Sequence, residues 1–186
     1  RAIVALAHAG TPVVGVCGGY QLLGERIEDP HGIESDTRAV AGLGLLPLRT
    51  IFDPVKTTDR ARGVIVADHG LLAGAAGLPV IGYEIHLGRT AGDLPPALRL
   101  TERQGVAADE PGGAISADGL IVGHYLHGFF DSPPLRGAIL RNLARRKGLP
   151  PRDWGATSPA DAAFDRLAAH VRAHLDLPAV YATMGL

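Results

Sequence analysis

Residues 13–24 read VVGVCGGYQLLG, and this segment gives the clearest indication of the fold class. The apolar run at 13–16 is typical of a short buried strand in a parallel sheet. A segment with helical spacing of its apolar residues follows at 18–27, so Cys17 stands where a strand ends and a helix begins. The alanine-rich residues 1–9 predict another helix just before the strand.

The rest of the chain predicts more strands, a polar loop over 28–42, and two C-terminal helices. Strands are expected at residues 43–52, 62–67, 79–90, 98–100, 114–116 and 119–126. The helices are expected at residues 133–147 and 160–175, with Ser158 as N-cap and Pro159 in the first turn of the second helix. Helices near both ends with strands between them predict a layered α/β fold, and the irregular spacing predicts a mixed, partly antiparallel sheet.

Length and composition exclude several classes of protein. The chain has 186 residues, 46% hydrophobic and 20% charged, which predicts one globular domain over 1–186. A net charge of −1 argues against nucleic acid as the main partner, and no apolar run is long enough for a membrane span. One cysteine excludes a disulfide scaffold and a multi-cysteine zinc site. The opening at Arg1 has no signal-peptide pattern, and we expect a cytoplasmic protein that is a fragment of a longer one.

The pattern Gly15-Val16-Cys17-Gly18-Gly19 is the cysteine form of a nucleophile elbow. A sharp strand-to-helix turn strains the backbone, needs small neighbours, and pushes the side chain out of the sheet end. The N–H groups that follow favour a negative charge at the turn, and the Gly18 N–H is a natural oxyanion donor. A lone cysteine is usually a small buried hydrophobe, but this context favours a nucleophile.

A nucleophilic cysteine needs a base, and His127 is the best placed of the eight histidines. It follows the apolar strand expected at 119–126, at the carboxyl end where open α/β sheets place their sites. His86 and His124 are the rivals. The remaining histidines are expected on helix surfaces or in polar loops and are His8, His31, His69, His170 and His174.

Five motifs occur in one order along the chain. They are GVCGGYQLLG at 15–24, DPHGIE at 29–34, GLGLL at 42–46, GYEIHLGRT at 82–90 and GHYLHG at 123–128. This series resembles the C-terminal class I glutamine amidotransferase domain of the cobyric acid synthases, a CobB/CobQ-like family. The resemblance implies a flavodoxin-like fold, a mixed sheet flanked by helices, whose first strands and second oxyanion donor precede Arg1.

The resemblance also implies a reaction. Cys17 would attack the carboxamide of glutamine, His127 would serve as base, and Gln21 with Gly18 would help bind the substrate. The released ammonia would pass to an N-terminal ATP-dependent synthetase domain, where a corrinoid substrate is amidated. ATP and Mg²⁺ would act in that domain, and we expect no cofactor and no metal in this chain, which has no GxxxxGK[ST] phosphate loop.

One departure from the wider class concerns the group that orients the base. Many class I amidotransferases have Glu two residues after the histidine, where this chain has Phe129. The resemblance therefore implies a Cys–His dyad, with Asp131 and Glu84 as candidates to orient the imidazole. On a strand, Glu84 and His86 share one face. They would either support the site or a domain contact, or form an ion pair on a solvated surface.

Several alternatives stay open at this point. A sister amidotransferase of cobyrinic acid a,c-diamide synthesis shares the architecture, but the GGYQLLG residues after the cysteine and the DPHG residues favour the cobyric acid synthases. The amidotransferase that acts on cell-wall lipid intermediates has a similar cysteine block. Ile85 argues against the cell-wall enzyme, in which the corresponding tripeptide tends to be Glu-Asn-His. A flavodoxin-like cysteine peptidase would not explain Gln21. A non-catalytic binding domain that retains an elbow cysteine would not explain Cys17, Gln21 and His127 together.

Overall fold

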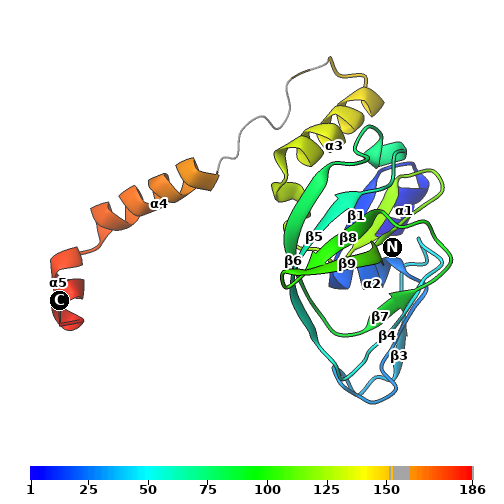
Figure 1. Ribbon diagram of the computed structural model, residues 1–186, viewed down its shortest axis with the longest axis horizontal. Coiled ribbons are helices and arrows are strands. Elements are labelled where there is room, and N and C mark those ends of the chain that lie inside the picture. Colours follow the sequence, from blue (N-terminus) through cyan, green and yellow to red (C-terminus); the bar gives the residue numbers. More distant parts are fainter. Residues whose placement is uncertain (151, 153–159, 186) are drawn as a thin grey trace. The chain divides into compact units, whose positions relative to one another are not determined.

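The computed structural model describes residues 1–150, 152 and 160–185 of the chain (Figure 1). These residues form two compact units, Arg1–Gly155 and Ala156–Leu186. The proposed cap at Ser158 and the proline at Pro159 lie outside the described residues. The expectation of one domain over 1–186 stays a prediction.

A three-stranded sheet forms the centre of the first unit. Its strand order is β1-β11-β10, with β1 at Val13–Val16, β11 at Ile121–His124 and β10 at Ala114–Ile115. β1 runs parallel to β11 in a register that places Val16 beside His124, and β10 is antiparallel to β11. Both strands that the sequence predicted around the candidate site are therefore neighbours in one sheet, and their carboxyl ends meet at one edge.

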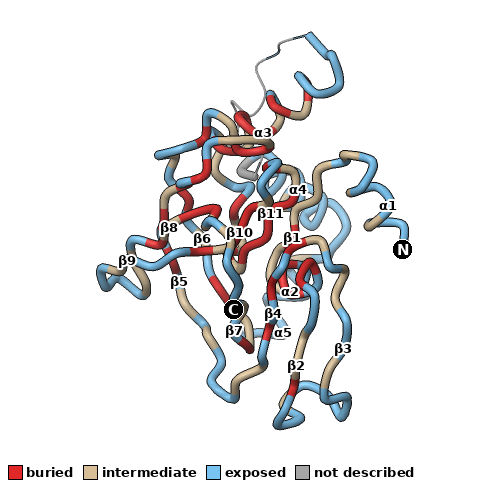
Figure 2. Tube along the Cα trace, turned by 90° about the vertical axis from the view of Figure 1, so that its right-hand side faces the viewer, coloured by how far each residue is buried: buried red, intermediate tan, exposed pale blue. Residues whose placement is uncertain are grey.

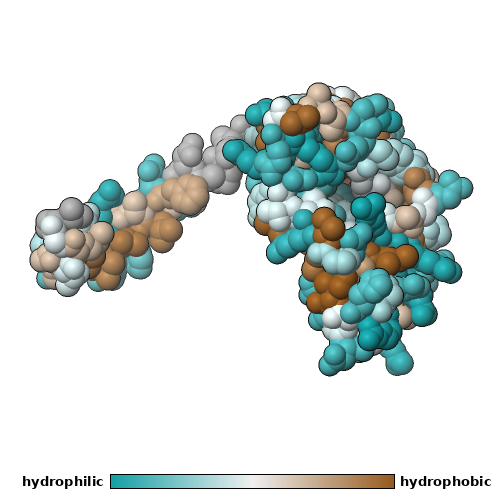
Figure 3. All heavy atoms as spheres, turned by 60° about the horizontal axis from the view of Figure 1, so that its bottom comes forward, coloured by the Kyte–Doolittle hydropathy of each residue, from teal (hydrophilic) through white to brown (hydrophobic). Residues whose placement is uncertain are grey.

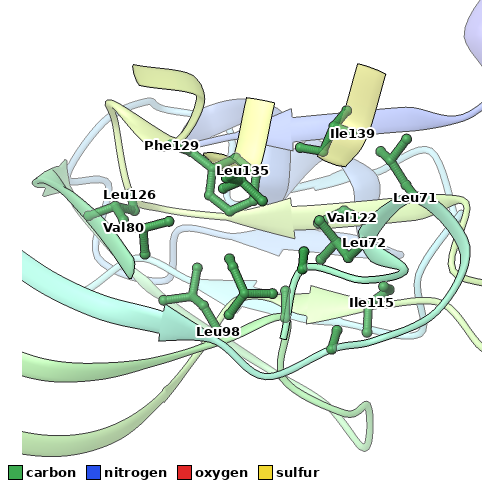
Figure 4. Close-up of a cluster of buried hydrophobic side chains, with 14 of the residues drawn as sticks. Leu71, Leu72, Val80, Leu98, Ile115, Val122, Leu126, Phe129, Leu135 and Ile139 are labelled. Carbon is green, nitrogen blue, oxygen red and sulfur yellow. The ribbon is translucent and has the colours of Figure 1, made fainter. Parts of the chain in front are cut away.

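Helices cover both faces of this central sheet. Val122 and Ile115 face one hydrophobic cluster, which also contains α3 (Pro133–Arg146), while Ile121 and Ala114 face a second cluster with α2 (Gly18–Leu23). Successive strand residues point to opposite faces, so the run of apolar residues in β11 serves both clusters. In Figure 4, Leu135 and Ile139 of α3 lie beside the strand that carries Val122, which is β11. Buried residues are concentrated in β10, β11, α2 and α3 (Figure 2).

Two four-stranded sheets join this centre. The first has the order β3-β2-β4-β7, with β2 at Arg26–Glu28, β3 at Ala39–Ala41, β4 at Arg49–Ile51 and β7 at Arg89–Ala91. The second is antiparallel, has the order β6-β5-β8-β9, and comprises β5 at Thr57–Ile65, β6 at Pro79–His86, β8 at Leu98–Arg103 and β9 at Val106–Gly112. The predicted α/β fold with mixed sheets flanked by helices is confirmed, with the strands divided among three sheets.

Short elements complete the first unit. They are α1 at Ala2–His8, η1 at Gly70–Leu72 and η2 at Phe129–Asp131. Gly10 follows α1 with a φ of 81°, the left-handed conformation expected of a glycine after a helix. Asn142 of α3 fixes the turn after η1, because its side-chain amide donates to the carbonyls of Leu71 and Ala73, both at 2.9 Å.

Three sequence predictions of local structure were wrong. The helix expected at 18–27 ends at Leu23, and Ile27 belongs to β2, because residues 26–28 pair with β3 and β4. The loop expected at 28–42 contains β3, and the strand expected at 43–52 is confined to β4. These short strands owe their structure to pairing with distant residues, which local periodicity does not reveal.

β9 was missed altogether. It pairs with β8 through a tight turn at Gln104 and Gly105, whose φ angles are 50° and 81°. Positive φ at both central residues matches a type I′ hairpin turn. Most of β9 is exposed, so it lacks the apolar alternation by which strands are recognised.

The second unit contains α4 (Ala160–His174) and α5 (Leu177–Thr183), of which α5 was not predicted. Asp176 caps α5, accepting a hydrogen bond from the Ala179 N–H at 3.1 Å. Apolar side chains are exposed along this unit, among them Phe164, Leu167 and Val171 at helical spacing (Figure 3). None of the helices within the described residues has the length and apolar character to cross a membrane.

Candidate active site

Cys17 lies on a strained turn between β1 and α2. Its φ is 54° and its ψ is −118°, a conformation that side-chain-bearing residues rarely adopt. Its N–H donates to the His124 carbonyl at 2.9 Å, which continues the pairing of β1 with β11. The strained backbone that the sequence predicted is present.

The glycines around the elbow do not contribute equally. A Cβ at Gly15 would lie 2.6 Å from a Leu23 methyl and 2.7 Å from the Gly19 carbonyl oxygen, so only glycine fits there. A Cβ at Gly18 or Gly19 would meet no atom within 4 Å. The steric requirement therefore falls on the glycine before the cysteine, and the space beside Gly18 and Gly19 is open.

The Cys17 sulfur borders a pocket of about 270 Å³. The thiol is half-buried and donates to the Ile85 carbonyl of β6 at 3.4 Å. The lining residues are Cys17, Gly18, Gln21, Glu34, Phe52, Lys56, Ile85, His86 and Leu87. The sulfur is thus reachable from an open space with several polar side chains.

His127 is placed against the same strand edge as the sulfur. Its N–H donates to the Tyr83 carbonyl at 2.8 Å and its carbonyl accepts from the Tyr83 N–H at 3.2 Å. Tyr83 and Ile85 are two residues apart on β6, which is about 7 Å along a strand. The sulfur and the His127 backbone therefore occupy adjacent positions of one edge, although Cys17 and His127 are distant in sequence.

The orientation of the His127 ring comes from an aromatic neighbour. It stacks on the Tyr83 ring with centroids 4.9 Å apart and an interplanar angle of 6°. In the described part of the chain, no carboxylate hydrogen-bonds to this ring, and neither Asp131 nor Glu84 orients it. Gly82 allows the backbone of β6 to approach the backbone of His127 closely, because a Cβ at Gly82 would lie 1.8 Å from the His127 carbonyl oxygen. The sequence offered no signal for Tyr83 in this role.

His124 is sealed inside the protein. It is fully buried, its ring stacks on Phe129 with centroids 4.1 Å apart, and neither ring nitrogen has a hydrogen-bond partner within the described structure. Burial lowers the pKa of His124 from 6.5 to about 4. A ring without access to solvent or to the pocket is poorly suited as a general base.

Glu84 and His86 share one face of β6, as predicted, but that face is buried. The Glu84 carboxylate accepts from Arg103 at 2.8 Å and lies 3.8 Å from His86 Nε2. Burial by itself would raise the pKa of Glu84, but the hydrogen bonds from His86 and Arg103 outweigh it and hold that pKa below its usual range. The interpretation as a solvated surface pair was wrong, because both side chains are buried, with the Tyr125 ring stacked on His86 and Arg103 donating to Glu84.

His86 lines two cavities. They are the pocket of Cys17 and a second cavity of about 240 Å³, which Glu84 and Arg103 also line. Its ring stacks on Tyr125 with centroids 3.6 Å apart. Glu84 lines only the second cavity, so the two predicted supporting residues have different surroundings.

Gln21 is buried at the pocket wall. Its side-chain amide donates to the Leu87 carbonyl at 2.9 Å and to the Tyr125 hydroxyl at 3.2 Å, and that hydroxyl is 2.6 Å from Thr90 Oγ1. This network ties α2 to the end of β6 and fixes the amide at the pocket. Tyr20 and Tyr125 serve in packing, as predicted, with ring centroids 5.2 Å apart.

Sequence reasoning missed two charged residues of the pocket, Glu34 and Lys56. The loop that carries Glu34 is organised by Asp29, whose carboxylate accepts from the N–H groups of Ile33, Glu34 and Ser35 at 2.7 to 3.0 Å. The acidic side chain inside the DPHGIE motif was a signal for the first residue. No local pattern marks Lys56, because the fold alone brings it to the cysteine.

Comparison with known proteins assigns the chain to a family. Residues 1–135 match the CobB/CobQ-like glutamine amidotransferase domain. The chain is 43% identical over 183 residues to a cobyric acid synthase of Dehalococcoides mccartyi, covering 98% of this chain and 36% of that protein. A cobyric acid synthase of Moorella thermoacetica is 41% identical over 188 residues, covering 100% of this chain and 36% of the relative. The chain thus spans about a third of the length of these curated relatives.

The fold has a counterpart among solved structures. A chain in the structure of PurLQS from Thermotoga maritima superposes with a TM-score of 0.53 and 18% identity, over 76% of this chain and 66% of that one. At this identity the likeness concerns the fold alone. Together with the match over residues 1–135, these findings show that the chain belongs to the CobB/CobQ-like glutamine amidotransferase domain family.

Proposed function

We propose that this chain is the glutaminase part of a cobyric acid synthase. It would release ammonia from glutamine for the ATP-dependent amidation of the b, d, e and g carboxylates of adenosylcobyrinic acid a,c-diamide, in cobalamin biosynthesis. The observation that carries the glutaminase step is the position of Cys17 on a strained elbow beside an open pocket. The identity of 41% to 43% to cobyric acid synthases supports the choice of synthase.

The reaction begins with attack of the Cys17 sulfur on the carboxamide carbon of glutamine. His127 takes the thiol proton, and the Gly18 N–H stabilises the negative oxygen of the tetrahedral intermediate. The intermediate collapses when the C–N bond breaks and the nitrogen takes the proton from His127, which leaves a γ-glutamyl thioester and ammonia. Water, deprotonated by His127, then cleaves the thioester to glutamate and the free thiol.

One local change would prepare this chemistry. The Cys17 thiol donates to the Ile85 carbonyl rather than to an imidazole, and the His127 ring stacks on Tyr83. We propose that glutamine, on entering the pocket, displaces the thiol from Ile85 so that it turns along the β6 edge towards His127. Catalytic hydrogen bonds often tighten only in the substrate complex.

The partner in this proposal is a synthetase domain of the longer protein. That domain would bind ATP, Mg²⁺ and the corrinoid, activate each carboxylate as an acyl phosphate and use the ammonia. The glutaminase chain itself would need neither a metal nor a cofactor, since attack by sulfur and proton transfer by imidazole complete its part.

Ammonia release from glutamine, measured with Cys17→Ala and His127→Ala, tests the glutaminase step. We expect no turnover for Cys17→Ala and a loss of about 10²–10⁴-fold for His127→Ala, the usual contribution of a general base. Unchanged turnover in His127→Ala would show that another residue is the general base, and His86 would be the first candidate. Activity retained by Cys17→Ala would overturn the proposal and favour a non-catalytic role for the cysteine.

Product analysis tests the choice of synthase. In the longer protein, Cys17→Ala should abolish glutamine-dependent amidation and leave ammonia-dependent amidation intact. Adenosylcobyrinic acid a,c-diamide should be amidated in preference to cobyrinic acid or a cell-wall lipid intermediate. If Cys17→Ala abolished amidation with ammonia as well as with glutamine, the result would indicate a structural role for Cys17.

A further inference from the structure

The pocket of Cys17 contains one acidic and one basic side chain that the glutaminase chemistry does not use. Glu34 comes from the loop between β2 and β3, and Lys56 immediately precedes β5. Both are exposed, and neither side chain forms an ion pair or hydrogen bond among the described contacts. Unpaired charges of opposite sign in one pocket are available for a ligand with both charges.

The fold holds each of these residues at the pocket. The Glu34 N–H donates to the Asp29 carboxylate at 2.9 Å, which fixes the backbone of its loop. Lys56 is next to Thr57, which pairs with His86 at the end of β6, and His86 itself lines the pocket. Neither position depends on a bond made by the charged group, so both groups stay available.

A free amino acid has the matching chemistry. Glutamine has an ammonium and a carboxylate on its α-carbon and a carboxamide at the far end of the side chain. When the carboxamide lies at the Cys17 sulfur, the α-carbon must occupy another part of the same pocket. Opposite charges on the wall there would distinguish free glutamine from glutamine residues in proteins, which lack both charges.

We propose that Glu34 binds the α-ammonium and Lys56 the α-carboxylate of glutamine. This inference rests on the proposed glutaminase function and names the residues that select its substrate. Charge-assisted hydrogen bonds of this kind change binding by about tenfold to a hundredfold each. They act on recognition of the amino acid and leave the reactivity of the sulfur unchanged.

The test compares two electrophiles that alkylate Cys17, followed by mass spectrometry of the intact chain. Diazo-oxo-norleucine has the α-ammonium and α-carboxylate of glutamine, whereas iodoacetamide has neither. We expect Glu34→Gln and Lys56→Met to slow labelling by diazo-oxo-norleucine about tenfold to a hundredfold and to leave labelling by iodoacetamide unchanged. Equal slowing by both reagents would indicate a structural defect and overturn the inference.

Modified forms of the reagent assign each charge to one residue. Acetylation of its amino group removes the ammonium, and esterification removes the carboxylate. Acetylation should slow labelling of the unaltered chain but not of Glu34→Gln, and esterification should slow the unaltered chain but not Lys56→Met. The opposite pattern, or full sensitivity retained in both variants, would contradict the assignment.

Two matched variants serve as controls. Asp36→Asn removes a neighbouring acidic side chain, and Lys147→Met removes the other lysine of the chain, and neither residue lines the pocket. Both should behave as the unaltered chain does with every reagent. If diazo-oxo-norleucine labels Cys17 as fast in all four variants as in the unaltered chain, the inference about Glu34 and Lys56 fails while the glutaminase proposal stands. If it does not label Cys17 in the unaltered chain, the glutaminase proposal itself fails.

Discussion

Cys17 keeps a backbone conformation that normally belongs to glycine. A non-glycine residue in such a region costs about 1–3 kcal/mol, and it persists because the surrounding structure fixes it. Here the fixing contacts are the Cys17 N–H bond to His124 and the close approach at Gly15. The pattern of glycines predicted this turn from the sequence, because the geometry depends on neighbours in the chain.

Replacing Cys17 by glycine should relieve this strain. We expect Cys17→Gly to be more stable than Cys17→Ala by about 1 kcal/mol, since alanine retains the Cβ that disfavours a φ of 54°. Urea unfolding of the two variants measures the difference. A glycine variant less stable than the alanine variant would show that the elbow is unstrained.

His124 makes stability depend on pH. Its pKa in the folded chain is about 4, against an ordinary value of 6.5, because burial disfavours the charged ring. Between these values the unfolded chain binds a proton and the folded chain does not, so stability falls as the pH is lowered from 6.5 to 4. The loss amounts to about 3 kcal/mol.

His124→Leu should remove this dependence. Between pH 6.5 and pH 4 the free energy of unfolding of the variant should fall less than that of the unaltered chain. At neutral pH the variant should not be penalised by the two buried ring nitrogens of His124, which have no hydrogen-bond partner within the described structure. Free energies of unfolding across this range measure the effect, with His31→Leu, at an exposed position, as the control. An equal slope for His124→Leu and the unaltered chain would contradict the account.

At the scale of the element, β6 is the part that brings the site together. Its edge contacts the Cys17 sulfur at Ile85 and the His127 backbone at Tyr83. Alternation along the strand correctly predicted that Glu84 and His86 share a face. It did not predict that the face is buried, because Arg103 and Tyr125, which contact it, are distant in sequence.

Gly82→Ala tests whether β6 seats His127. An added Cβ would meet the His127 carbonyl oxygen at 1.8 Å, and backbone cannot rotate away as a side chain does. We expect a loss of stability of about 1–3 kcal/mol, the usual cost of overpacking, and slower glutamine hydrolysis. Labelling of Cys17 by iodoacetamide should be unchanged.

The control for this variant is Ile81→Ala, which shortens an exposed side chain on the same strand. Its hydrolysis and its stability should stay close to those of the unaltered chain. Glutamine hydrolysis at full rate in Gly82→Ala would show that the position of His127 does not depend on this contact.

At the scale of the whole molecule, all three sheets of the first unit contribute to one pocket. Gln21 comes from α2 on the central sheet, Phe52 follows β4 of the first four-stranded sheet, and Ile85 lies in β6 of the second four-stranded sheet. The positions of the elbow and of His127 were predictable because short motifs mark them. Glu34 lies in the DPHGIE motif, which marked it but did not place it at the pocket. No motif marks Lys56, because only the fold brings it to the cysteine.

Asp29→Ala tests the loop that places Glu34. Burial by itself would raise the pKa of Asp29, but hydrogen bonds from the N–H groups of Ile33, Glu34 and Ser35 outweigh burial and lower that pKa. The ionised carboxylate therefore stabilises the folded chain above its ordinary pKa of about 4. This stabilisation is lost as the pH falls below that value. We expect a higher KM for glutamine at neutral pH with little change in kcat, since the sulfur and the base are untouched. A lower kcat at unchanged KM would contradict this account.

A search for the covalent intermediate tests whether Cys17 is the nucleophile that attacks glutamine. The chain is incubated with glutamine, quenched in acid and mapped by mass spectrometry, with Cys17→Ala as the control. We predict a γ-glutamyl thioester on Cys17 and none in the variant. Ammonia released by the unaltered chain and by Cys17→Ala at equal rates, with no adduct on Cys17, would contradict this prediction.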